Sequence, residues 1–107
     1  MKLFIVTCIK ENQAQVQKIF KQSKISAFSA ADITGFKDNQ PASLLQDWFA
    51  SGDEKFDSVV VFSFTGTENT DQAIELIKKY NEESATDFPI RAFVVPVEKA
   101  SYQDKSW

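Results

Sequence analysis

Residues 57–65 read Asp57-Ser58-Val59-Val60-Val61-Phe62-Ser63-Phe64-Thr65, and this stretch decides the fold. It is rich in β-branched and aromatic residues and Gly66 follows it, which is typical of a strand. Alternate side chains of a strand point to opposite faces, so apolar side chains fall on both faces here: Val59 and Val61 on one, Val60, Phe62 and Phe64 on the other. A sheet with one face in water alternates apolar and polar residues. We therefore expect both faces of this strand to be covered.

Length and composition limit the classes of protein to which the chain can belong. The chain has 107 residues, of which 43% are hydrophobic and 13% aromatic, so we expect residues 1–107 to form one domain with a real core. A net charge of −3 offers no general attraction to nucleic acid or to an anionic membrane. No apolar run approaches the ~20 residues of a membrane span, so we expect neither nucleic-acid binding nor membrane insertion.

The first apolar run, residues 2–9, is interpreted as a strand rather than a signal peptide. The run is short for a signal peptide, and Lys10 and Glu11 follow it at once. Cys8 is the single cysteine, so no disulfide can form within the chain. A lone cysteine in an apolar strand fits the reducing cytoplasm, which is the predicted location.

Hydrophobic periodicity predicts four strands and two helices. The predicted strands cover residues 2–9, 25–36, 57–65 and 88–97, and the predicted helices cover 12–23 and 69–81. Asn12 with Gln15, and Asn69 with Gln72, fit capping boxes at the two helix starts. The order βαββαβ predicts an α+β, ferredoxin-like fold, in which an antiparallel four-stranded sheet carries both helices on one face.

Two helices cover one face of the predicted sheet, yet three of its strands are apolar on both. The other face would then expose an apolar patch larger than monomers usually tolerate. We expect self-association through this face, with a trimer as the favoured form. The alternative is that the long connection at 37–56 folds back over it.

The connection at 37–56 is unusually long for so small a domain, which is typical of functional segments. It carries Trp48 and Phe49 together with two leucines. Trp is enriched in binding hot spots, so Trp48 and Phe49 are candidate anchors for a protein partner. Packing against the same or a neighbouring subunit explains them equally well.

Several stretches together resemble the PII/CutA-like superfamily of small trimeric proteins. Residues 1–5 (Met-Lys-Leu-Phe-Ile) look like the first strand of PII signalling proteins, and Gly35-Phe36 looks like the element that opens the PII effector-binding T-loop. The 37–56 connection then stands at the T-loop position. Pro89, Val97-Glu98 and a polar tail at 98–107 with Tyr102 and Trp107 echo the CutA end.

The resemblance implies a non-enzymatic regulatory trimer that binds a small molecule or ion in clefts between subunits. Its candidate ligand residues are Gly35, Phe36 and Asn39, to which Arg91 is added as the only guanidinium of the chain that is available for an anion. PII proteins cradle nucleotide phosphates with a glycine- and lysine-containing loop before the last strand. Residues 83–89 hold neither Gly nor Lys, and no ligand or cofactor is identified.

Two alternatives stay open. A CutA-like metal-tolerance protein would use Cys8 as a soft ligand, although a buried structural cysteine explains the residue more simply. Asp53, Glu54 and Asp57 are an acidic cluster that fits a hard cation or a solvated turn. A small ferredoxin-like enzyme is the third reading, although the sequence has no His and no Ser/His/Asp set.

Overall fold

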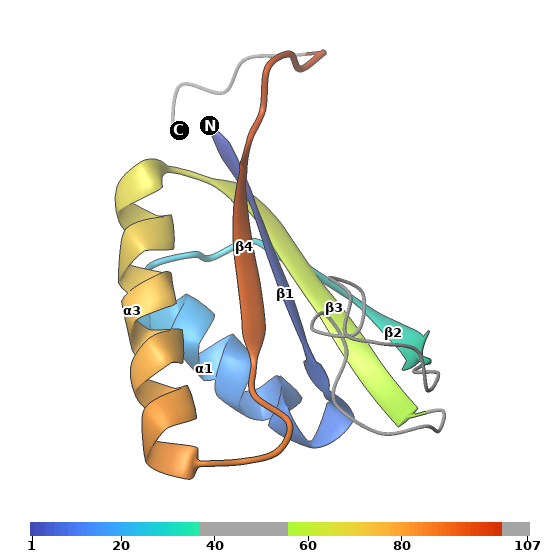
Figure 1. Cartoon of the computed structure of the whole chain (residues 1–107). Helices are drawn as coiled ribbons and strands as arrows, with labels where there is room; N and C mark the ends of the chain where they lie inside the picture. Colours follow the sequence, from blue (N-terminus) through green and yellow to red (C-terminus); the bar gives the residue numbers. More distant parts are fainter. Residues whose placement is uncertain (37–55, 102–107) are drawn as a thin grey trace, which may run out of the picture.

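The computed structural model describes residues 1–36 and 56–101. Its elements follow the predicted order (Figure 1): β1 (Lys2–Ile9), the 3-10 turn η1 (Lys10–Asn12), α1 (Gln13–Gln22), β2 (Ser29–Gly35), β3 (Phe56–Thr65), α3 (Thr67–Ser84) and β4 (Arg91–Pro96). The four strands form one sheet in the order β2-β3-β1-β4, and every pair is antiparallel. Both helices lie on the same side of this sheet (Figure 1). The predicted α+β, ferredoxin-like fold is confirmed.

The core lies between the helices and the inner face of the sheet. In the ladder Val6 pairs with Val61 on one side and with Ala92 on the other, so these side chains share the helix-covered face. The buried apolar residues of this layer are Phe4, Val6, Cys8, Val16, Ile19, Phe20, Ile25, Val59, Val61, Ala73, Ile77 and Ile90. Their alternation along β1 and β3 is the one that the period of a strand predicts.

The start of β2 differs from the predicted boundary. The prediction placed Ile25 in the strand, but the backbone N–H of Ile25 donates to the carbonyl of Phe20 at 2.9 Å and closes the end of α1. Lys24 takes a left-handed backbone conformation with φ 60°, as the residue after a helix often does. Ile25 is 2% exposed. It is therefore apolar because it is buried at the end of the helix, and not because it belongs to a strand.

Both predicted capping boxes are wrong, because the asparagines bond across the fold. Neither helix start has a side-chain cap. The Asn69 amide donates to the carbonyl of Ser23 at 2.9 Å, and the Asn12 amide donates to that of Phe88 at 3.4 Å. Asn69 thus connects α3 to the end of α1, and Asn12 connects the start of α1 to the segment before β4.

The segment before β4 is held by α3. The Asn81 amide group donates to the carbonyl of Ile90 and accepts from the Ile90 N–H, both at 2.9 Å. Ala85 ends the helix in a left-handed conformation with φ 46°. The last strand therefore begins at Arg91 rather than at the predicted Phe88, because Ile90 bonds to Asn81 of the helix and Phe88 bonds to Thr86 and Asn12.

Candidate functional site

The face of the sheet that points away from the helices is rich in apolar side chains. We call this surface the open face. Its apolar half contains Leu3, Ile5, Phe62, Phe64, Phe93 and Val95, which are neighbours in the ladder. Phe64 is 43% exposed, Phe93 39% and Val95 41%. Clustered exposed aromatic and aliphatic side chains on one surface are typical of an interaction site.

The other half of the open face is more polar and contains Arg91. Arg91 pairs with Thr7, and Thr7 pairs with Val60 on its other side. Thr7 is 3% exposed, whereas Arg91 is half-buried. Arg91 is the only charged side chain at the open-face positions of the four described strands.

Gly35 lies where a side chain would not fit. It pairs with Phe56 at the end of the β2–β3 ladder, and a Cβ atom at this position would run into the Phe56 ring. That ring also contacts the ring of Phe88 edge-on, with centroids 6.5 Å apart. Phe36, directly after Gly35, is 61% exposed. Gly35 thus has a packing role at the end of β2.

The structure does not bring the predicted ligand residues together within one chain. Gly35 and Arg91 lie at the same end of the sheet but on its two opposite edge strands, with β3 and β1 between them. Three strand spacings separate the two edge strands by roughly 14 Å across the sheet, and the register places Arg91 level with Ala31, four residues before Gly35. A cleft that uses both therefore needs a second subunit. Asn39, Trp48 and Phe49 lie outside the described residues.

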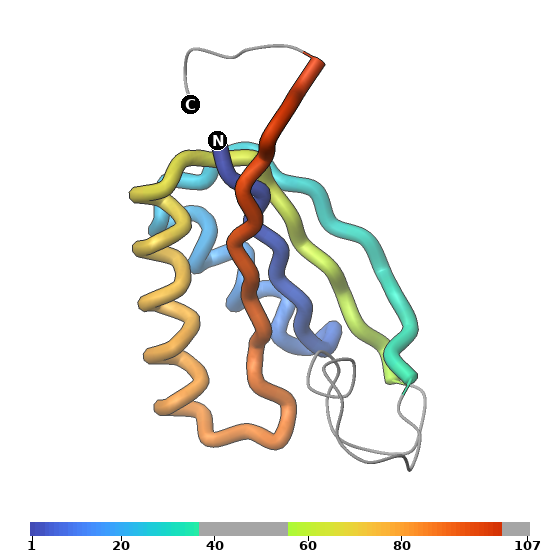
Figure 2. The backbone as a smooth tube through the Cα atoms, turned by 45° about the horizontal axis from the view of Figure 1, so that its top comes forward, coloured from blue at the N-terminus to red at the C-terminus, as the bar shows by residue number. Residues whose placement is uncertain are grey.

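A hollow of about 510 Å³ lies at the opposite end of the molecule. It is lined by the connection from α1 to β2 and by the turn from β3 into α3: Lys24, Ile25, Ser26, Ala27, Ser63, Phe64, Thr65, Gly66, Thr67, Glu68 and Asn69. Figure 2 shows these two connections side by side at the same end as the N-terminus. The sequence prediction missed this hollow, because its walls come from segments far apart in the chain.

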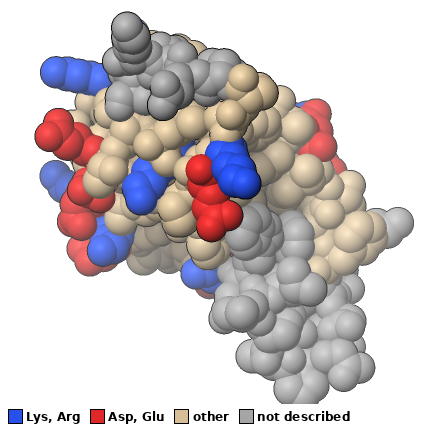
Figure 3. Space-filling model, turned by 90° about the horizontal axis from the view of Figure 1, so that it is seen from above, with Lys and Arg blue, Asp and Glu red and all other residues tan. Residues whose placement is uncertain are grey.

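The walls of the hollow are mostly polar. The Ser63 hydroxyl donates to the carbonyl of Ala27 at 2.5 Å, which holds the two connections together. Lys24 and Glu68 bring one charge of each sign. Seen from this end (Figure 3), charged side chains of both signs are densest on the side where α3 lies. The hollow thus offers hydrogen-bonding groups without a dominant charge.

A smaller hollow of about 170 Å³ lies near the other end of β2 and β3. Its walls include Lys10 and Asp32, whose side chains form an ion pair at 3.7 Å, and Asp57. Both members of the pair are well exposed, so the pair contributes little to stability. Within residues 1–36 and 56–101, no group of three or more Cys, Asp or Glu side chains is arranged to hold a metal. Asp53 and Glu54 of the predicted acidic cluster lie outside these ranges.

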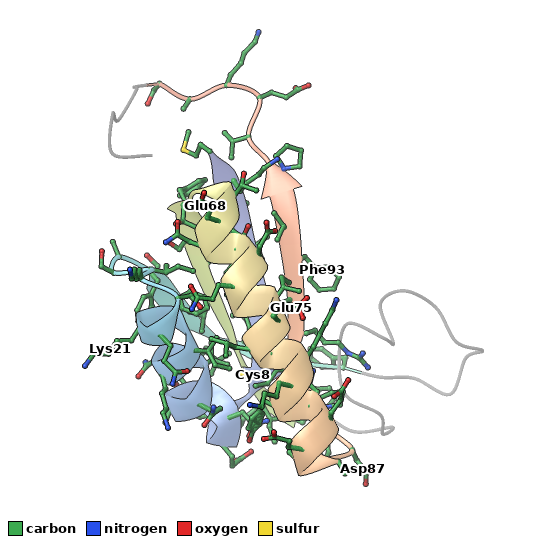
Figure 4. The ribbon with its side chains drawn as sticks, turned by 90° about the vertical axis from the view of Figure 1, so that its left-hand side faces the viewer. Cys8, Lys21, Glu68, Glu75, Asp87 and Phe93 are labelled. Atoms are coloured by element: carbon green, nitrogen blue, oxygen red, sulfur yellow. The ribbon has the colours of Figure 1, made fainter. Side chains whose placement is uncertain are left out.

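Cys8 lies on the helix-covered face and is 5% exposed. Figure 4 shows it behind the two helices, whereas Phe93 stands beside β4. Burial raises the pKa of the Cys8 thiol from 9.0 to about 11. Since the thiolate is the form that binds metals and attacks electrophiles, this environment favours the inert, protonated thiol.

Residues 83–89, which the resemblance compares with the phosphate loop of PII proteins, use part of their backbone for internal bonds. The carbonyl of Phe88 accepts from Asn12, and the N–H of Phe88 donates to the Thr86 hydroxyl at 3.1 Å. Together with the Asn81 clamp on Ile90, these bonds give the segment a structural role in joining α3 to β4.

Comparison with known proteins supports the fold. No protein-family model matches the sequence, and no curated protein matches it either. Two similar solved structures are a PII-like signalling protein from Thermus thermophilus (9% identity, TM-score 0.60, 87% of this chain and 82% of that one) and CPII from Thiomonas intermedia. CPII is a nitrogen regulatory PII-like protein whose structure holds ADP, AMP and bicarbonate; the match has 7% identity and a TM-score of 0.61 and covers 92% of this chain and 93% of that one.

The chain therefore has the fold of PII-like signalling proteins, and the predicted resemblance is confirmed at that level. At identities of 9% and 7% the likeness shows the fold alone. None of the helices in the described part of the chain has the length and apolar character needed to cross a membrane.

Proposed function

We propose that residues 1–107 form one PII-like domain of a cytoplasmic regulatory protein that acts without catalysing a reaction. Three copies associate through their open faces, and a small molecule or ion binds in the clefts between them. The 37–56 connection, with Trp48 and Phe49, transmits the bound state to a protein partner.

The open face is the observation that carries this proposal. Apolar side chains of β3 and β4, Phe64, Phe93 and Val95, stay more than a third exposed in the single chain, and Leu3 and Ile5 of β1 lie between them on the same face. Burying exposed apolar area stabilises an assembly by about 25 cal/mol per Å², and the closed symmetry of homo-oligomers lets every copy cover the same patch. The PII-like fold supports a regulatory rather than a catalytic role.

The position of Gly35, Phe36 and Arg91 supports binding between subunits. Their strands β2 and β4 are the two edges of the sheet, so in a ring of copies one subunit's β2 edge can approach its neighbour's β4 edge. Asn39 would join this cleft from the start of the long connection. The 510 Å³ hollow at the other end is a second place where a polar effector fits.

The test combines the mass of the assembly with a ligand panel. Light scattering coupled to size-exclusion chromatography should give three times the chain mass, and a monomer at micromolar concentration would contradict the proposal. A thermal-shift panel of adenine nucleotides, cyclic nucleotides, 2-oxoglutarate, copper and zinc then identifies the effector class. A ligand at about 100 times its Kd adds about 2.7 kcal/mol to the unfolding free energy; a flat panel would leave protein binding through Trp48 as the remaining role.

The metal-tolerance alternative assigns Cys8 as a copper ligand. It requires the buried thiol to ionise and become accessible. Copper binding that disappears in Cys8→Ser would favour this alternative over an effector sensor, whereas unchanged copper binding in that variant would remove Cys8 from consideration.

A further inference from the structure

Arg91 is a cation on a surface that otherwise carries no charge in the described strands. No Asp or Glu occupies an open-face position of β1, β2, β3 or β4. The ion pairs formed among the described residues join other side chains: Lys10 with Asp32, Lys78 with Glu75, and Lys79 with Glu83. A guanidinium stays protonated in proteins and offers five N–H donors. Arg91 therefore meets no carboxylate from the part of the chain that the structure describes.

Association through the open face would take this cation out of water. Arg91 and Phe93 are two positions apart on the same face of β4, and Arg91 lies opposite Thr7 while Phe93 lies opposite Ile5. A second copy that covers Phe93 therefore also excludes water from the neighbourhood of Arg91. A buried charge without a partner is strongly destabilising, and the Arg91 side chains of several copies repel one another.

We infer that a small oxyanion binds Arg91 as the copies associate, so that the assembly depends on the anion. This inference rests on the proposed self-association through the open face. The planar guanidinium matches carboxylate and phosphate groups, which accept two parallel hydrogen bonds from it. The apolar side chain of Phe93, two positions along the same face of β4, and the exclusion of water on association strengthen such a contact, because water no longer competes for the donors.

The coupling makes the anion a regulator of assembly. A ligand that binds the assembled form and not the single chain shifts the equilibrium toward assembly by mass action. By the same linkage, assembly raises the affinity of the chain for the anion. The fraction of chains that are assembled then rises with the concentration of the oxyanion.

Sedimentation velocity of the full chain measures this dependence directly. The chain is diluted in series in sodium chloride, sodium phosphate and sodium acetate at equal ionic strength and equal neutral pH. We expect the concentration at half-assembly to fall by about tenfold or more, relative to chloride, in at least one oxyanion. The phosphate and acetate series separate a phosphate ligand from a carboxylate ligand.

Arg91→Met removes the charge and keeps an unbranched side chain. We expect this variant to assemble in chloride as readily as the unaltered chain does in the effective oxyanion, with no response to the anion. Lys18→Met, at an exposed position of α1, changes the net charge by the same amount away from the open face. It should respond to the anion as the unaltered chain does.

Each outcome decides the matter. Equal assembly of the unaltered chain in all three salts overturns the inference and leaves self-association standing. An anion response that persists in Arg91→Met also overturns it, because the anion then acts elsewhere. Single chains in every buffer and every variant overturn the proposed function itself. If circular dichroism shows that Arg91→Met is unfolded, the salt series on the unaltered chain decides alone.

Discussion

The two faces of the sheet carry similar side chains in different surroundings. On the helix-covered face Phe4, Val59 and Val61 are 0% exposed, while on the open face Phe93 is 39% exposed. β1 and β3 contribute apolar residues to both faces in strict alternation. The difference comes from the helices, which cover one face only, and it assigns one set of apolar residues to folding and the other to association. Substitutions on each face, each with a control variant, test this division of roles.

The largest expected effect is on the helix-covered face. Phe20 is 0% exposed and its ring contacts those of Phe4 and Phe28 at centroid distances of 5.4 and 5.1 Å. We expect Phe20→Ala to lower the unfolding free energy by about 3–5 kcal/mol, since it removes a buried ring and leaves a cavity. Urea denaturation at one fixed protein concentration measures the loss. Phe28→Ala, at a ring that is 37% exposed, should lose clearly less; equal losses would contradict the ranking.

A charge on the open face should instead break the assembly. We expect Phe93→Asp to weaken association by about 2 kcal/mol or more, because an apolar anchor is replaced by a carboxylate that the interface would desolvate. Light scattering should show single chains, while far-ultraviolet circular dichroism stays unchanged. Gln17→Asp, on the exposed side of α1, is the control and should leave the mass unchanged. Loss of folding in Phe93→Asp would mean that the two faces do not divide their roles in this way.

The joint between α3 and β4 belongs to the helix-covered side and tests how firmly the helix is attached. Asn81→Ala leaves the N–H and carbonyl of Ile90 without their side-chain partner, and Ile90 is 2% exposed. We expect a loss of about 1–3 kcal/mol in unfolding free energy. The exposed neighbour Glu82 provides the control, and Glu82→Ala should change stability by less than about 0.5 kcal/mol. A similar loss of unfolding free energy in Asn81→Ala and Glu82→Ala would show that water replaces the hydrogen bonds of Asn81.

The last prediction concerns the pH dependence that Cys8 contributes, which vanishes at neutral pH. Burial raises the pKa of the Cys8 thiol from 9.0 to about 11. Below pH 9 the thiol is neutral in both the folded and the unfolded chain, so it adds no pH dependence. Between pH 9 and 11 the unfolded chain loses this proton first, so stability falls with rising pH, by at most about 1.4 kcal/mol per pH unit. The slope of stability against pH should be shallower in Cys8→Ala, and equal slopes would show that the thiol is not desolvated.

The period of the apolar residues predicts the fold correctly but places some boundaries of the strands wrongly. The prediction of a strand at residues 2–9 is confirmed with the same limits by β1, because a short continuous apolar run with a polar stop at Lys10 and Glu11 leaves little choice. Ile25 misled the prediction: a single apolar residue cannot tell whether a helix end or a strand buries it. Asn12 and Asn69 misled it too, since an asparagine satisfies its amide with whichever carbonyl the fold brings near.

The candidate site was less predictable than the fold. The resemblance selects Gly35, whereas Arg91 is selected as the only arginine of the chain. The sheet order places the two residues on opposite edges. The 510 Å³ hollow had no signal in the sequence, since residues 24–27 and 63–69 meet only in three dimensions. The one local hint was Gly66, a glycine between a strand and a helix, which marks a turn but not a hollow.

By itself the sequence determined the order of strands and helices and the presence of apolar side chains on both faces of the sheet, because the period of a strand is two residues and that of a helix is 3.6. Only the tertiary structure decided which of the two faces the helices cover. Strand-to-strand connections of this kind are right-handed, so both helices fall on the side of Phe4 and Val61. That choice buried Cys8, left Phe93 exposed, and placed Arg91 on the face where the described strands carry no carboxylate.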